Sequence, residues 1–186
     1  MEDALPLSQK SKPFAQSFWV REGLLCAGCY PGDLDSQQRD IKLQGLVDCG
    51  IRRILNLVEA DETSRGGVPF EPYELRLQEL AAAAGISIEC LRFPIRDASA
   101  PTRPTMRQIL DAIDDSVQRT IPTYIHCWGG HGRTGTVVAC YLIRLGLTPR
   151  AALERVAGFR KGLPKCHYPF EGDQERFVLA WREVRK

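Results

Sequence analysis

Hydrophobic positions in this 186-residue chain alternate between short strand-like runs and longer runs with helical spacing. Short apolar runs bounded by turn residues indicate buried strands, whereas apolar positions that recur every three or four residues indicate amphipathic helices. Strands that alternate with helices predict an α/β fold with a mostly parallel sheet. The strand-like runs are 18–27, which we interpret as a hairpin with Glu22-Gly23 at its turn, then 51–57, 86–91 and 123–126.

The helical runs have clear starts and stops. The run 37–49 ends at Gly50 and the run 73–84 ends at Gly85, and glycine is the residue that most often closes a helix. Further helices are predicted from Pro104, over 136–145, from the N-cap Thr148-Pro149 to Ala157, and around Phe177. The prediction is a central sheet of four to five strands flanked by helices.

Composition limits the possible classes of protein. The chain is 44% hydrophobic and 26% charged, as globular domains are, and its formal net charge of +2 gives no basic field for nucleic acid. No apolar run approaches the roughly 20 residues of a membrane span, and residues 1–6 do not resemble a signal peptide. We therefore expect a monomer with one domain at 18–186 behind a flexible, polar arm at 1–17, and neither nucleic-acid nor membrane partners.

The most informative stretch is residues 127–135, Cys-Trp-Gly-Gly-His-Gly-Arg-Thr-Gly, which lies between the strand at 123–126 and a helix. Glycine permits positive φ and close backbone approach, so successive N–H groups can turn inward, and the helix adds its positive N-terminal end. We expect this loop to bind a tetrahedral dianion and to lower the pKa of the Cys127 thiol. The loop glycines are Gly129, Gly130 and Gly132.

The polar residues of this loop have roles that their type and spacing predict. Cys127 is the expected nucleophile, and it would form a cysteinyl-phosphate intermediate. Arg133 can offer its planar fork to two phosphate oxygens, a contact that strengthens as charge spreads in the transition state. Thr134 can donate to the Cys127 sulfur, and His126 is expected to order the loop rather than to transfer protons. The pocket wall is assigned to Trp128 and His131.

This pattern resembles the signature of the cysteine-dependent protein tyrosine phosphatase superfamily, closest to its compact dual-specificity-like branch. The matching residues are His126-Cys127-x-x-Gly130-x-Gly132-Arg133-Thr134-Gly135, with a strand before them and a helix after them. The resemblance covers about residues 18–183. It implies a catalytic domain that hydrolyses phosphomonoesters of proteins, phosphotyrosine first and phosphoserine or phosphothreonine second, with no metal and no cofactor.

The departing alkoxide or phenoxide needs a proton, and Asp97 is the expected donor. It follows the strand-like run 86–91 in a Pro-bounded segment that is suited to a mobile loop. Similar phosphatases carry an Asp followed four positions later by Pro, some thirty residues before the nucleophile, and Asp97 and Pro101 match that spacing. Three further acids fall in a helical pattern, and we expect them on its solvated face: Asp111, Asp114 and Asp115.

Two residues near the expected site leave alternatives open. Arg96, next to Asp97, either meets the substrate phosphate or is simply exposed. Gln174 loosely resembles a glutamine that positions the hydrolytic water in some relatives, but the simpler expectation is an exposed helix residue.

The cysteines predict the compartment. Seven is an odd count, and a required thiolate argues against an oxidising environment, so we expect a cytoplasmic protein. Cys26 and Cys29 form one C-x-x-C pair without a second pair at zinc spacing, and we interpret them as ordinary strand-end cysteines. The resemblance implies that Cys49 or Cys90 could form a protective disulfide with Cys127 under oxidation.

Three functions compete. The first is a phosphatase with Cys127 as nucleophile, Arg133 as phosphate and transition-state binder, and Asp97 as general acid and base. The second is an inositol phosphate or phosphoinositide phosphatase, although relatives that act on such ligands often carry lysines inside the loop, and this loop has none. The third is a non-catalytic phosphopeptide-binding module, which would usually lack the nucleophile, the arginine or the acid.

Overall fold

Five short strands form one mixed sheet in the order β1-β2-β5-β3-β4. β1 pairs antiparallel with β2, and the strands β2, β5, β3 and β4 run parallel to one another. The computed structural model describes residues 11–64, 66–164 and 172–182. The strands are β1 (Ser17–Arg21), β2 (Leu25–Gly28), β3 (Arg53–Asn56), β4 (Glu89–Arg92) and β5 (Thr123–His126). This topology confirms the predicted single α/β domain with a mostly parallel sheet.

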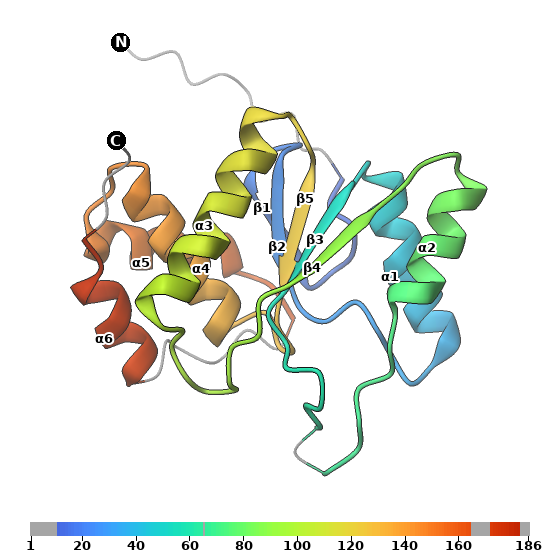
Figure 1. Ribbon diagram of the computed structural model, residues 1–186, viewed down its shortest axis with the longest axis horizontal. Coiled ribbons are helices and arrows are strands. Elements are labelled where there is room, and N and C mark those ends of the chain that lie inside the picture. Colours follow the sequence, from blue (N-terminus) through green and yellow to red (C-terminus); the bar gives the residue numbers. More distant parts are fainter. Residues whose placement is uncertain (1–10, 65, 165–171, 183–186) are drawn as a thin grey trace.

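Helices cover both faces of the sheet, with α1 and α2 on one side and α3 to α6 on the other (Figure 1). Successive strand residues point to opposite faces, so Ile54 and Tyr124 join the α1–α2 core while Leu55 and Ile125 join the other. The helices are α1 (Ser36–Asp48), α2 (Glu74–Ala83), α3 (Arg103–Gln118), α4 (Gly132–Arg144), α5 (Pro149–Arg160) and α6 (Asp173–Ala180). In the described part of the chain, no helix is both long and apolar enough to cross a membrane.

Side-chain caps fix where several helices begin. The Asp35 side chain accepts hydrogen bonds from the backbone N–H groups of Gln37 and Gln38, and Thr102 and Thr148 cap α3 and α5 in the same way. These caps explain why the predicted starts agree with the structure to within a few residues.

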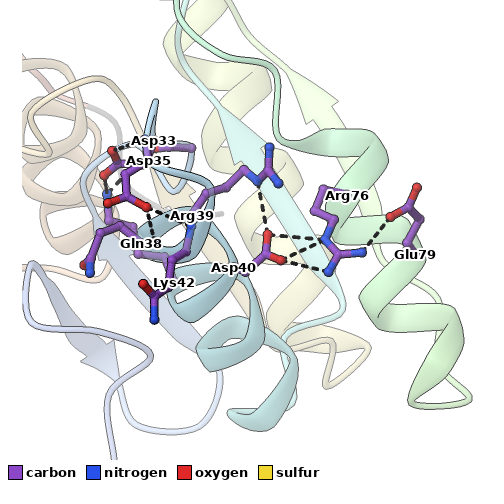
Figure 2. Close-up of polar contacts among 10 residues, drawn as sticks. Asp33, Asp35, Gln38, Arg39, Asp40, Lys42, Arg76 and Glu79 are labelled. Atoms are coloured by element: carbon purple, nitrogen blue, oxygen red, sulfur yellow. Dashed lines mark hydrogen bonds and ion pairs between the residues drawn. The ribbon is translucent and has the colours of Figure 1, made fainter.

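Ion pairs join α1 to α2. Figure 2 shows Asp40 of α1 between Arg39 and Arg76, with Arg76 of α2 also bound to Glu79. Exposed pairs of this kind contribute about 0–1 kcal/mol each, so they stabilise the domain little compared with the buried core between α1 and α2.

The packed part of the chain begins inside the predicted arm. Pro13 is buried, and Phe14 packs edge-to-face on Tyr124 with ring centroids 5.7 Å apart. The Pro13 carbonyl lies so close to α1 that a Cβ at Gly45 would be 2.0 Å from it. The predicted flexible arm at 1–17 therefore extends too far, and its first ten residues lie outside the described residues.

The connections that follow the parallel strands meet at one edge of the sheet. The segments after β3 (57–73), β4 (93–102) and β5 (127–131) all lie at the lower edge in Figure 1. Ligands of open α/β sheets bind beyond the carboxyl ends of the strands. This is the edge where the sequence places the candidate site.

Candidate active site

The loop between β5 and α4 lies where the sequence predicts it, and its backbone packs closely against β2. Cys127 directly follows β5 and is only 3% exposed. Gly130 has φ +72°, and a Cβ there would lie 2.5 Å from the backbone carbon of Gly28 in β2. Glycine is required at this position by both conformation and space. Gly129 and Gly132 do not use this freedom, because neither has a positive φ.

α4 begins five residues after Cys127, so its N-terminal end lies in the loop where the sequence predicts anion binding. The N-cap residue, His131, makes no side-chain capping bond. The first N–H groups of a helix have no acceptor within the helix, and they form the positive end of its dipole. These donors therefore stay available for a phosphate next to the sulfur.

Glu62 binds the Arg133 guanidinium through both of its terminal nitrogens. Its side chain is 1% exposed, and Nη1 and Nη2 donate to the two carboxylate oxygens of Glu62 at 2.5 and 2.7 Å. Nη1 also donates to the Ile95 carbonyl at 3.0 Å. Among the described residues Nε has no hydrogen-bond acceptor, but Nη2 on the same edge also lies 3.0 Å from Asp97 Oδ1, so a phosphate bound along the Nε–Nη2 edge would displace this carboxylate from Nη2.

The charge of Arg133 is secured by its neighbours. Burial acts to lower the pKa of this guanidinium, but the hydrogen bonds to Glu62 and the charges of Cys127, Glu62 and Asp97 outweigh it and leave the pKa raised. A buried, permanently charged fork beside a cysteine suits the stabilisation of a phosphoryl group.

The structure brings the predicted acid to the predicted arginine. Asp97 Oδ1 lies 3.0 Å from Arg133 Nη2, and the Asp97 side chain is 70% exposed. The next residue, Ala98, has φ +56°, which is strained for a residue with a side chain. The Ser99 N–H closes this turn by donating to the Arg96 carbonyl at 3.1 Å. Arg96 is exposed, which agrees with both alternatives given for it.

Gln174 is buried, whereas an exposed helix residue is expected from the sequence. It is 3% exposed, because α6 packs against α4 and turns this side chain inward. Its Nε2 donates to the Ser99 carbonyl at 3.1 Å, and a Cβ at Gly132 would lie 2.5 Å from its Oε1. Gln174 therefore joins the acid loop (residues 93–101) to the phosphate loop (residues 127–133) and is not an exposed helix residue.

His126 is enclosed and neutral. Burial lowers its pKa to about 3. Its Nε2 lies 2.7 Å from the Tyr73 hydroxyl and its Nδ1 lies 3.1 Å from the Cys127 carbonyl oxygen. If Nδ1 carries the proton, it donates to Cys127 while Nε2 accepts from Tyr73. These contacts support the predicted role of His126 in ordering the loop.

The remaining loop residues are partly as expected. Thr134 Oγ1 is buried and has no hydrogen-bond partner among the described residues, so the predicted donation to the Cys127 sulfur is not made in this structure. Trp128 is 46% exposed and stacks on Phe70 at the rim, as a wall residue would. The backbone carbonyl of His131 accepts a hydrogen bond from Arg160 of α5.

The three acids assigned to a solvated helix face bind buried arginines instead. Asp111 and Asp114 of α3 pair with Arg144 at 2.7 and 3.1 Å, and Asp115 pairs with Arg53 at 2.7 Å. Asp114 is only 15% exposed, so the solvated-face prediction is wrong for it. Unpaired buried charge is costly, which is why these carboxylates meet both arginines.

The cysteines proposed as redox partners lie in separate elements. Cys90 is on β4, which β3 separates from β5, and Cys49 caps the C-terminus of α1. Cys29 follows β2, and burial raises its pKa to about 11. None of the six described cysteines is in a disulfide, and the bond to Cys127 stays a prediction. Among the described residues no group of three or more His, Cys, Asp or Glu side chains is placed to hold a metal ion.

Comparison with known proteins shows the family to which this chain belongs. The family model for the Swiss Army Knife protein DSP-PTPase phosphatase domain (PTP-SAK) matches residues 19–168. The chain belongs to this DSP-PTPase family. Phosphatases of this family act on phosphorylated proteins or on small phosphorylated lipids and inositols.

Individual relatives of this DSP-PTPase domain are distant. Cyclin-dependent kinase inhibitor 3 of Sus scrofa is 30% identical over 141 residues, which are 73% of this chain and 62% of that protein. The putative tyrosine phosphatase 067L of Invertebrate iridescent virus 3 is 32% identical over 100 residues, which are 47% of this chain and 42% of that protein. The chain thus spans about half the length of these curated relatives.

Solved structures agree on the fold. Tk-PTP in its active form superimposes with a TM-score of 0.64 at 25% identity, covering 89% of this chain and 95% of that one. PTPMT1 in complex with PI(5)P and the core catalytic domain of the S. cerevisiae PP-IP phosphatase SIW14 both give 0.63, at 17% and 14% identity. Likeness at such low identity shows the fold alone, so it leaves the substrate class open.

Sequence reasoning missed three residues that reach the site from elsewhere. Glu62 lies in the polar segment after β3, and its position at the carboxyl end of a parallel strand is the signal that could have identified it. Tyr73 and Arg160 follow ordinary helical patterns, so the sequence offers no comparable signal for them.

Proposed function

We propose that this domain hydrolyses phosphomonoesters, with protein phosphotyrosine as the first substrate and phosphoserine or phosphothreonine as further substrates. The carrying observation is the convergence of Cys127, the Arg133 guanidinium and the carboxylate of Asp97 at the N-terminus of α4. Family membership supports the same reaction class.

In the first step, the Cys127 sulfur attacks phosphorus as the bond from phosphorus to the ester oxygen breaks. Protonated Asp97 gives its proton to the departing oxygen, and Arg133 with the loop N–H groups binds the phosphoryl oxygens. In the second step, water attacks phosphorus and gives a proton to Asp97. The sulfur then leaves as thiolate, and inorganic phosphate is released.

Protein substrates are favoured over inositol phosphates by the absence of lysine from the phosphate loop. A ligand with several phosphates needs several cations, and within this loop Arg133 is the single Lys or Arg residue. The requirement for a free thiolate leads us to propose a reducing compartment such as the cytoplasm. The monomeric state stays a prediction.

Turnover of p-nitrophenyl phosphate is the direct test. The wild-type domain should release p-nitrophenol, and Cys127→Ser should abolish release while inorganic phosphate still binds. Cys90→Ser, on β4, is the matched control and should keep wild-type turnover. Substantial turnover by Cys127→Ser would contradict the proposal, and phosphopeptide binding by a wild-type domain without turnover would favour a non-catalytic binding module.

A further inference from the structure

An apolar groove opens beside the phosphate loop. Its volume is about 130 Å³, and it lies between the segments that follow β2 and β3. Leu34 is 75% exposed and Val68 is 47% exposed, so two aliphatic side chains face solvent here. The groove is below the roughly 300–1,000 Å³ of pockets that enclose a small molecule, and its size suits a single side chain. Its apolar wall consists of Tyr30, Leu34, Val68, Pro69, Phe70 and Trp128.

The wall of this apolar groove is fixed to the phosphate loop. Trp128 directly follows Cys127, and its ring stacks on Phe70 with centroids 4.1 Å apart and planes 6° apart. The Tyr30 N–H donates to the Trp128 carbonyl at 2.8 Å. A substrate whose phosphate is held at Cys127 therefore has the groove as its immediate neighbour.

Acidic side chains surround this region. A neighbouring cavity of about 310 Å³ shares Tyr30, Pro69 and Phe70 with the groove. Its one described cation is Arg92, and Glu74 neutralises that charge at 2.9 Å. Its acidic lining is Glu59, Asp61, Glu62 and Glu74.

Three of the acids carry negative charge that no described cation balances. Glu62 is occupied by Arg133 and Glu74 by Arg92. Glu59 and Asp61 in the neighbouring cavity, and Glu71 in the apolar groove, have no ion pair with any described residue. The described residues of this edge therefore carry an excess of negative charge, which repels ligands that carry negative charge beyond the phosphate being hydrolysed.

We propose that this edge is a specificity subsite for phosphotyrosine peptides that carry an apolar residue and a basic residue close to the phosphotyrosine. The apolar side chain enters the groove, and the basic side chain lies against Glu59, Asp61 and Glu71. The inference rests on the proposed function and narrows its substrate class. Polyphosphorylated inositols and anionic lipid surfaces are disfavoured by the same charges.

The test uses three phosphotyrosine peptides that differ only at the positions flanking the phosphotyrosine, two on each side. At these positions they carry Leu and Lys, Ser and Lys, or Leu and Glu, and they are named accordingly. The Leu/Lys peptide should exceed both the Ser/Lys and the Leu/Glu peptide about tenfold in kcat/KM, each value divided by that for p-nitrophenyl phosphate. Val68→Ser should reduce the preference for Leu, and Glu71→Gln the preference for Lys, each by about threefold or more. The matched controls are Leu75→Ser, at an exposed leucine of α2 outside both cavities, and Glu154→Gln on α5.

Binding separates this inference from the proposed function. The Cys127→Ser domain should bind the Leu/Lys peptide more tightly than the other two, whether or not the wild-type domain is active. If the wild-type domain shows no turnover but the binding preference for the Leu/Lys peptide is kept, the proposed hydrolase activity is wrong and the subsite is supported. Equal binding of the three peptides overturns the subsite even in an active enzyme. A loss of preference in the control variants, or faster turnover of phosphoinositide vesicles or soluble inositol phosphates, also overturns it.

Discussion

Glu62 orients Arg133 although it has no part in the proposed reaction itself. Its carboxylate accepts from both terminal nitrogens of Arg133, while Nε has no hydrogen-bond acceptor among the described residues. Nearby, the Glu59 N–H donates to Glu62 Oε2 at 3.3 Å, so the segment after β3 holds the carboxylate in place. Glu62 is thus a positioning residue for Arg133.

We predict that Glu62→Gln lowers kcat/KM for p-nitrophenyl phosphate by roughly 10- to 100-fold, because small displacements of a catalytic fork have large effects on rate. Steady-state kinetics with a thermal melt measures the effect and separates it from unfolding. Glu59→Gln, from the same segment, is the control and should stay near the wild-type rate. Wild-type kinetics for Glu62→Gln would show that the ion pair does not orient Arg133.

Gly130 gives a second prediction at this scale. Gly130→Ala should destabilise the fold by more than about 2 kcal/mol, because it adds left-handed strain to a clash with the Gly28 backbone. Gly129→Ala should cost far less, since its φ is ordinary and a Cβ there meets only the His131 ring, at 3.1 Å. Urea unfolding of both variants tests this contrast, and similar midpoints would refute it.

How much of the site the sequence predicts depends on whether its residues are local. Cys127 and Arg133 belong to one loop, and Asp97 has a known spacing from it, so a pattern finds all three. Glu62 reaches Arg133 from 71 positions away, and Gln174 reaches Ser99 from 75 positions away. No periodicity or spacing encodes such contacts, because they depend on how whole helices and strands pack.

Among the elements, the acid loop is the one expected to respond to substrate. It is tied to α6 through Gln174 and strained at Ala98, while its carboxylate is exposed. Helices and strands were predictable because caps, glycine stops and alternation are local signals. The extent of the N-terminal arm was not, because Pro13 and Phe14 pack against distant residues.

We predict that Asp97→Asn lowers kcat by roughly 10²–10⁴ for substrates with poor leaving groups, because an amide cannot supply the proton. Activated aryl phosphates, whose leaving groups need little protonation, should be affected much less. The variant should also lose the basic limb of the pH–rate profile. Asp173→Asn, on α6, is a carboxylate control. An unchanged pH profile for Asp97→Asn would assign the general acid to another residue.

At the scale of the whole molecule, His126 links stability to pH. Burial places its folded-state pKa at about 3, below the ordinary value of 6.5. Between these values the unfolded chain binds a proton that the folded domain does not, so stability is complete above pH 6.5 and falls as pH drops towards 3. The maximum slope from this residue is about 1.4 kcal/mol per pH unit.

Urea unfolding between pH 4 and 8 should show this slope in the wild type, and His126→Gln should unfold with a shallower one. Because the variant removes the bonds to Tyr73 and Cys127, its stability at pH 8 will also be lower. An NMR titration of wild-type His126 gives an independent readout. Protonation of this imidazole near pH 6 in the folded domain would contradict the prediction.

The contact between Gly130 and the Gly28–Cys29 backbone also bears on how reactivity is acquired. Its two partners are far apart in the chain and meet only when β2 lies alongside β5. A nascent or partly unfolded chain therefore carries Cys127 without the packed phosphate loop around it. The proposed phosphate site is then completed in the same step that brings β2 alongside β5.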